Sequence, residues 1–119
     1  EQLKANIETY AEDKPLTQAE FDRIVELADN EIKQNSLPCT ACRYCTTHCP
    51  KELPIPELIA LYNEHKVTGG GFMAPMAVAR MEADKRPANC LGCKSCEKVC
   101  PQLIKISEMM SDFSSMIGM

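Results

Sequence analysis

Hydrophobic side chains at helical spacing predict two helices at the start of the chain. Leu3, Ile7 and Tyr10 recur every three to four residues among charged neighbours, which indicates a short amphipathic helix over residues 2–11. A second helix should begin at Thr17, because Thr17 and Glu20 have the Thr-x-x-Glu spacing of a capping box, and should continue to about residue 34. Its apolar stripe consists of Phe21, Ile24, Val25, Ala28 and Ile32.

Three more helices are predicted in the rest of the chain. Pro56 suits the first turn of a helix that continues to about Lys66. The segment from Pro75 to about Asp84 has apolar residues crowded on one side and should form the next helix. Ser107 can cap a last helix that extends towards Met116. Alternating β-branched positions are missing from the sequence, so an all-α fold is expected.

From Cys39 onwards the chain contains an internal repeat with an offset of 51 residues. Segment 39–50 aligns with segment 90–101 without a gap, and the alignment continues into the helix predicted after each segment. The aligned apolar pairs are Leu53 with Ile104, Ile55 with Ile106, Leu58 with Met109, Ile59 with Met110, and Tyr62 with Phe113. We expect each repeat to form a loop, a short extended piece and a helix, with the two repeats related by a pseudo-twofold axis. Tyr62 and Phe113 are expected to belong to the core and to pack against the clusters, with no role as an electron relay.

Each repeat begins with the same run of four cysteines. The first run is CTACRYCTTHCP, from Cys39 to Pro50, and the second is CLGCKSCEKVCP, from Cys90 to Pro101. Together they contain all eight cysteines of the protein. The spacing C-x2-C-x2-C-x3-C-P is the ligand pattern of bacterial [4Fe–4S] ferredoxins. Closely spaced thiolates can surround one cluster while nearby backbone amides donate hydrogen bonds to its sulfurs.

In ferredoxins with two clusters, the fourth cysteine of each run binds the other cluster. The first cluster is therefore assigned to Cys39, Cys42, Cys45 and Cys100. The second is assigned to Cys90, Cys93, Cys96 and Cys49. This exchange ties the repeats together, so we expect the loops to lose their structure when the clusters are removed.

Other uses of the cysteines fit the spacing less well. Structural zinc is usually bound by separated C-x2-C pairs. Disulfides are typical of exported chains, and we expect this chain to have no export signal. A [3Fe–4S] cluster has no support, because neither run lacks a cysteine. His48 precedes the fourth cysteine of its run, where a surface or packing role is a simpler interpretation than a bond to the cluster.

The charge balance narrows the range of partners. Thirteen Lys and Arg against seventeen Asp and Glu give a net charge of −4, which argues against nucleic acid and anionic membranes. No apolar run approaches the roughly 18 residues of a membrane span, and we expect a cytoplasmic location. Solvated charge is a simpler interpretation than a docking face for four lysines near the cysteine runs, namely Lys51, Lys94, Lys98 and Lys105. No nucleophile–base or carboxylate pair indicates catalysis in this chain alone.

The segments around the cysteines resemble one family. LPCTACRYCTTHCPK at 37–51, with IPEL at 55–58 and LYNE at 61–64, is similar to the C-terminal iron–sulfur domain of bacterial aldo/keto-reductase-like oxidoreductases. KPLTQAEF at 14–21 and KRPANCLGC at 85–93 resemble that family too. The resemblance extends from about residue 2 to Met110.

The resemblance implies that the chain is the electron-transfer part of a larger reductase. In that family a TIM barrel precedes this domain and carries the catalytic residues, so NAD(P) or flavin is expected only on a missing domain or a partner. Residues 1–36 are then a helical arm, and residues 37–119 an α-helical ferredoxin domain with two [4Fe–4S] clusters. The expected partner is the upstream barrel or another redox protein.

Two alternatives remain open. In the first, the chain is a free-standing ferredoxin or an iron–sulfur subunit of a multi-subunit reductase. In the second it is a structural or sensor module whose clusters have no electron partner. Redox cycling of the clusters by a partner separates the electron-transfer interpretations from the structural one.

Overall fold

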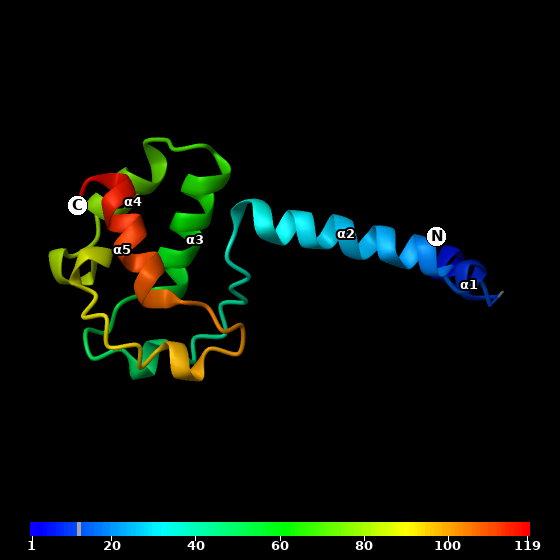
Figure 1. The fold of residues 1–119 in the computed structure, drawn as a ribbon, viewed down its shortest axis with the longest axis horizontal. Helices are drawn as coiled ribbons and strands as arrows, with labels where there is room; N and C mark the ends of the chain where they lie inside the picture. Colours follow the sequence, from blue (N-terminus) through cyan, green and yellow to red (C-terminus); the bar gives the residue numbers. More distant parts are fainter. Residues whose placement is uncertain (12) are drawn as a thin grey trace. The chain divides into compact units, whose positions relative to one another are not determined.

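A computed structural model gives the fold and describes residues 1–11 and 13–119, with the backbone alone at 31–35. Ile32, assigned above to the apolar stripe, therefore has its side chain outside the described part. All regular elements in the described residues are helical, so the all-α prediction is confirmed (Figure 1). The chain divides into two units, Glu1–Glu31 and Ile32–Met119. None of the helices described combines the length and the apolar character needed to cross a membrane.

The first unit contains α1 (Gln2–Tyr10) and most of α2 (Gln18–Asn35). The predicted capping box is present at the start of α2. The Thr17 amide donates to Oε2 of Glu20 at 2.9 Å, and the Glu20 amide donates to Oγ1 of Thr17 at 3.3 Å. The large apolar residues of this unit are exposed, namely Leu3, Ile7, Tyr10, Leu16, Phe21, Ile24, Val25 and Leu27.

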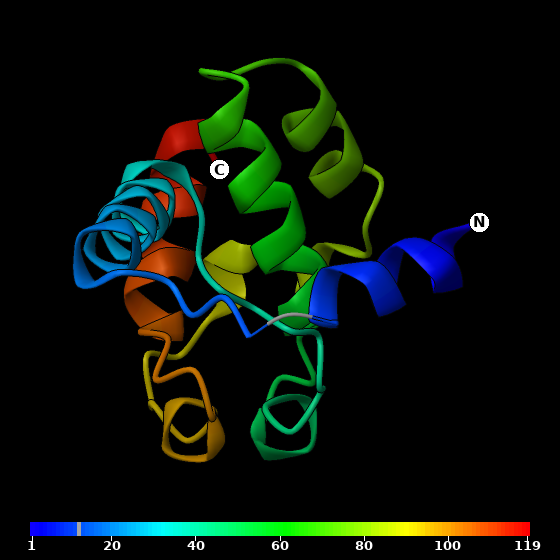
Figure 2. The same cartoon turned by 90° about the vertical axis from the view of Figure 1, so that its right-hand side faces the viewer.

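The second unit is built on the two repeats. The first repeat forms the 3₁₀ turn η1 (Thr46–His48) and helix α3 (Ile55–Val67), and the second forms η4 (Glu97–Val99) and α5 (Ile106–Ile117). Between them lie α4 (Met73–Ala79), η2 (Ala83–Lys85) and η3 (Pro87–Asn89). Turns η1 and η4 lie side by side at one end of the unit (Figures 1 and 2).

The repeat extends to the conformation of the backbone. Three aligned pairs of residues all have φ between 50° and 65°, namely Ala41 with Gly92, Arg43 with Lys94, and Glu52 with Leu103. The hydrogen bonds are repeated as well, since the amide of Cys49 donates to Thr46 and that of Cys100 to Glu97, both at 3.2 Å. The two cysteine loops therefore follow the same path.

The core lies between α3 and α5 and is formed by the aligned apolar positions. The members of all five pairs are at most 6% exposed, namely Leu53, Ile55, Leu58, Ile59, Tyr62, Ile104, Ile106, Met109, Met110 and Phe113. The rings of Tyr62 and Phe113 meet edge to face, with their centroids 5.8 Å apart. The Tyr62 hydroxyl donates to Oδ2 of Asp112 at 2.7 Å, so its polar end is satisfied. The prediction that both rings belong to the core is confirmed.

The helix predicted from Pro75 to about Asp84 is wrong at both ends. The observed helix α4 begins at Met73 and ends at Ala79. The guanidinium of Arg86 donates to the carbonyl oxygen of Ala79 at 2.8 Å and to that of Met81 at 3.3 Å. Carbonyls that a longer helix would have bonded internally are therefore satisfied by a side chain from beyond it.

The predicted capping role of Ser107 is also wrong. Helix α5 begins at Ile106, so Ser107 lies within the first turn. Its amide and hydroxyl donate to Oε1 of Glu97 at 2.8 and 2.5 Å, so the acceptor comes from turn η4. The aligned position in α3 is Pro56, which has no amide hydrogen and needs no such acceptor.

Candidate iron–sulfur cluster sites

The eight cysteines line two cavities in the second unit. Site 1 is lined by Cys39, Cys42, Cys45 and Cys100. Site 2 is lined by Cys49, Cys90, Cys93 and Cys96. Three cysteines of each site come from one run, and the fourth comes from the other run. The structure thus brings together the same two sets of four that the sequence suggested.

Burial of the cysteines follows the same order at both sites. The third cysteine of each run is buried, with Cys45 8% and Cys96 7% exposed. The second cysteine of each run, Cys42 or Cys93, is exposed. Each site therefore has a protected interior and one edge at the protein surface.

Left-handed residues flank the second cysteine of each loop. Ala41 and Arg43 lie on either side of Cys42, at φ of 53° and 65°, and the aligned Gly92 and Lys94 have φ of 65° and 59°. Left-handed residues within a turn direct successive backbone amides into one concavity, which favours anions such as a thiolate-bound cluster. The loops therefore offer amide donors as well as thiolates.

Apolar side chains from the helical layer close both cavities. Ile59 and Ile104 line site 1, whereas Leu53 and Met110 line site 2. Ile106, the first residue of α5, lines both sites. One buried isoleucine therefore borders both cavities, and water is excluded on this side of each. Tyr62 and Phe113 line neither cavity, so the expectation that these core rings pack against the clusters is wrong.

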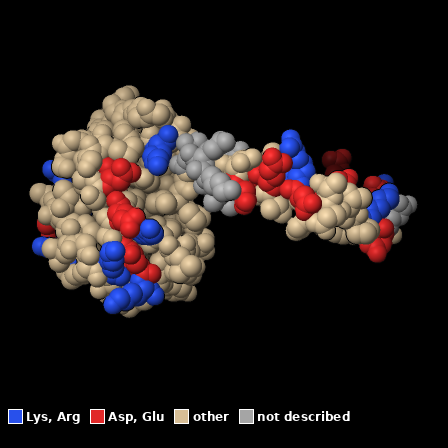
Figure 3. Space-filling model, viewed as in Figure 1, with Lys and Arg blue, Asp and Glu red and all other residues tan. Residues whose placement is uncertain are grey.

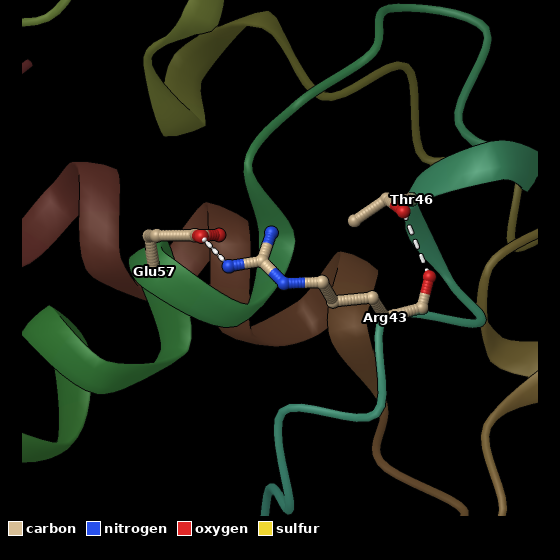
Figure 4. A network of polar contacts seen from close by, with 3 residues as sticks. All are labelled: Arg43, Thr46 and Glu57. Atoms are coloured by element: carbon tan, nitrogen blue, oxygen red, sulfur yellow. Dashed lines mark hydrogen bonds and ion pairs between the residues drawn. The ribbon is translucent and has the colours of Figure 1, made fainter.

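Each cysteine loop is fastened to the helix that follows it by a polar side chain. In the first repeat the guanidinium of Arg43 pairs with the carboxylate of Glu57 on α3, and the Thr46 hydroxyl donates to the Arg43 carbonyl at 2.7 Å (Figure 4). In the second repeat the corresponding link is from Glu97 to Ser107 on α5. The two loops are thus fixed by different chemistry.

The environment of the thiols differs between the interior and the edge of the sites. Burial raises the pKa of Cys96 to about 11 and also raises the pKa of Cys45. Hydrogen bonds from the backbone and hydroxyl of Ser95 lower the pKa of Cys93. Because iron binds thiolates, loading the sites must release the protons of the buried thiols.

The donor set fits a cubane cluster. Each cavity offers four thiols, an amide-lined turn and an apolar wall, which are the groups that hold [4Fe–4S] clusters. Among the residues described, no three Cys, His, Asp or Glu side chains converge closely enough to hold a single metal ion, as structural zinc would need. The fold and the sites define a helical iron–sulfur protein of the ferredoxin class.

Comparison with known families identifies this class further. Residues 38–105 match the model of the 4Fe–4S dicluster domain. The match covers more than half of the 119 residues, and the chain belongs to this family. The protein therefore holds two [4Fe–4S] clusters with four cysteine ligands each, and its role is electron transfer. Comparisons with curated proteins and with solved structures gave no match.

The sequence alone did not reveal every residue that shapes the sites. Glu97 and Ile106 were not recognised, and neither was the Leu53 amide, which donates to Sγ of Cys49 at 3.5 Å. The replacement of Pro56 by Ser107 at the aligned position was a signal for Glu97, because it introduces an amide that needs an acceptor. His48 is exposed at the rim of site 2, and its Nδ1 lies 3.0 Å from the Tyr44 carbonyl oxygen.

Proposed function

We propose that the chain is the electron-transfer domain of an aldo/keto-reductase-like oxidoreductase. In this proposal Cys39, Cys42, Cys45 and Cys100 bind one [4Fe–4S] cluster. The cysteines Cys49, Cys90, Cys93 and Cys96 bind the other. Such clusters accept and release one electron at a time, and the residues of this chain hold them, exclude water and set their charge environment.

The observation that carries the electron-transfer proposal is the sharing between the two sites. Each site takes its fourth cysteine from the opposite run, and Ile106 lines both. This arrangement supports two clusters close to one another, separated by buried apolar side chains. The exposed Cys42 and Cys93 mark the edges at which external partners approach.

The reductase context is supported by the resemblance of the segments around the cysteines. It is supported also by the exposed apolar residues of the first unit, of which Tyr10 is 87% and Phe21 53% exposed. Exposed apolar surface is typical of a region that packs against another domain. We propose that this arm packs on the reductase barrel and that NAD(P) or flavin binds on the barrel or on a partner.

Electron transfer is tested with anaerobically reconstituted protein. A flavin-containing reductase supplied with NAD(P)H should bleach the visible absorbance of both clusters, and air or a chemical oxidant should restore it. Dithionite alone serves as the control for reducibility. If the clusters hold iron but neither the reductase nor dithionite changes their oxidation state, electron transfer is refuted and a structural or sensor module is favoured.

The reductase context is tested separately, by the length of the native polypeptide. An antibody raised against this chain should detect in cells a protein large enough to include a barrel of about 250 residues. Detection of a product of only 119 residues would contradict the barrel proposal and favour a free-standing ferredoxin or a small subunit.

A further inference from the structure

The two sites share one backbone path but differ in the charges around them. Lys51 and Lys94 line site 2, together with His48 at the rim. Lys98 lies in turn η4, between the third and fourth cysteines of the second run. The carboxylate of Glu97 lies in the same turn and is engaged by the amide and hydroxyl of Ser107.

Site 1 is lined by one basic residue, Arg43, and its guanidinium is paired with the carboxylate of Glu57 (Figure 4). The positions aligned with Lys51 and Lys98 are Gln102 and Thr47, and both are uncharged. Gln102 lines site 1 just as Lys51 lines site 2. Positive charge is therefore balanced at site 1 and in excess at site 2.

Hydrogen bonds to sulfur differ in the same direction. At site 2 the Leu53 amide donates to Sγ of Cys49 at 3.5 Å. Ile104 and Cys100 are aligned with Leu53 and Cys49, but among the described residues the Ile104 amide makes no corresponding hydrogen bond to Sγ of Cys100. Both net positive charge and donors to sulfur stabilise an added electron, and so raise the reduction potential.

We infer that site 2 has the higher reduction potential and that an electron delivered to this chain comes to rest there. The inference depends on the proposed ligand sets and electron-transfer function, and it adds an order to the two sites. Figure 3 shows Lys and Arg, with Asp and Glu beside them, at the end of the second unit where η1 and η4 lie. In this account Lys51 and Lys94, which line site 2, stabilise the reduced state, a more specific role than solvated charge.

The test uses the aligned pair Lys51 and Gln102, both of which are exposed, so that their exchange leaves the core unchanged. Reconstituted protein is titrated anaerobically with dithionite and mediators at fixed pH and followed by EPR, each step adding one electron per cluster. Lys51→Gln should lower the higher-potential step, with the equilibrium constant falling by up to about tenfold, or about 59 mV. Gln102→Lys should raise the lower-potential step by a similar factor.

Lys51→Arg is the matched control, because it retains the charge and should leave both steps in place. The inference is overturned when Lys51→Gln moves the lower-potential step, or when neither exchange moves any step. In those cases the clusters still cycle, and the proposed function stands. Failure of dithionite to reduce either cluster would instead refute electron transfer itself.

Discussion

The link from Glu97 to Ser107 gives a sharp test of how the cysteine loops are held. Replacing Glu97 with Ala removes the acceptor for the Ser107 amide and hydroxyl, both of which are half-buried at the start of α5. A hydrogen bond to a charged group contributes about 1.5–3 kcal/mol to stability. We therefore expect Glu97→Ala to reduce the local free energy of unfolding at the start of α5 by about 2 kcal/mol. Because about 1.4 kcal/mol changes an equilibrium constant about tenfold, the population of the locally open state should rise about thirtyfold.

The assay is the rate of iron release from reconstituted protein to an excess of chelator, followed by loss of the cluster absorbance. Glu97→Ala should accelerate release by about thirtyfold, if opening at the start of α5 exposes site 2. Thr46→Ala is the matched control at the aligned position. It removes only an exposed hydroxyl bond to the Arg43 carbonyl, so its effect should be a few-fold at most.

The repeat supplies the decisive comparison. Ser107→Pro copies the residue at the aligned position, Pro56, and removes the amide that Glu97 satisfies. In the Ser107→Pro background, Glu97→Ala should therefore have little effect on the rate of iron release. A double-mutant cycle isolates this coupling from any direct effect of the Glu97 charge on Cys96. An equal effect in both backgrounds would refute the capping explanation.

Two further predictions concern the backbone and the core. Gly92→Ala should destabilise the protein by about 1–2 kcal/mol, and the penalty is purely conformational because φ is +65° and an added Cβ meets nothing within 4 Å. Ala41→Gly, at the aligned position, should be neutral to slightly stabilising. Equal thermal midpoints of cluster loss for Gly92→Ala and wild type would contradict the prediction for Gly92. Phe113→Ala should destabilise the protein by about 3–5 kcal/mol because the ring is fully buried, whereas Tyr62→Phe should cost about 1 kcal/mol through the lost bond to Asp112. Urea unfolding of the reconstituted protein measures both, and a larger loss for Tyr62→Phe would be inconsistent with the observed packing.

The repeat made most of the second unit predictable. Because the period of 51 residues aligns apolar positions as well as cysteines, the burial of Leu53 with Ile104 and of Tyr62 with Phe113 followed from the sequence. The all-α architecture was also predictable, because helical spacing and caps are local signals. Thr17 and Glu20 formed the expected capping box for this reason.

The features that were not predictable depend on contacts between separate segments. The end of α4 is set by Arg86, seven residues beyond Ala79, so apolar periodicity alone extended that helix too far. The N-terminus of α5 is satisfied by Glu97, ten residues away, and not by the local hydroxyl of Ser107. Propensity and periodicity describe a segment by itself and contain no information about such partners. The charge difference between the sites became visible only when the lining residues were known.

The number of clusters is the central claim, and chemical analysis tests it most directly. Protein prepared anaerobically should contain about eight iron and about eight acid-labile sulfide per chain, and dithionite should produce the EPR signal of reduced [4Fe–4S] clusters. Cys42→Ser should lower the iron content of site 1, and Cys93→Ser that of site 2, because each variant removes one exposed ligand from one site. About four iron per chain in fully folded wild-type protein, or zinc in place of iron after anaerobic preparation, would contradict the account.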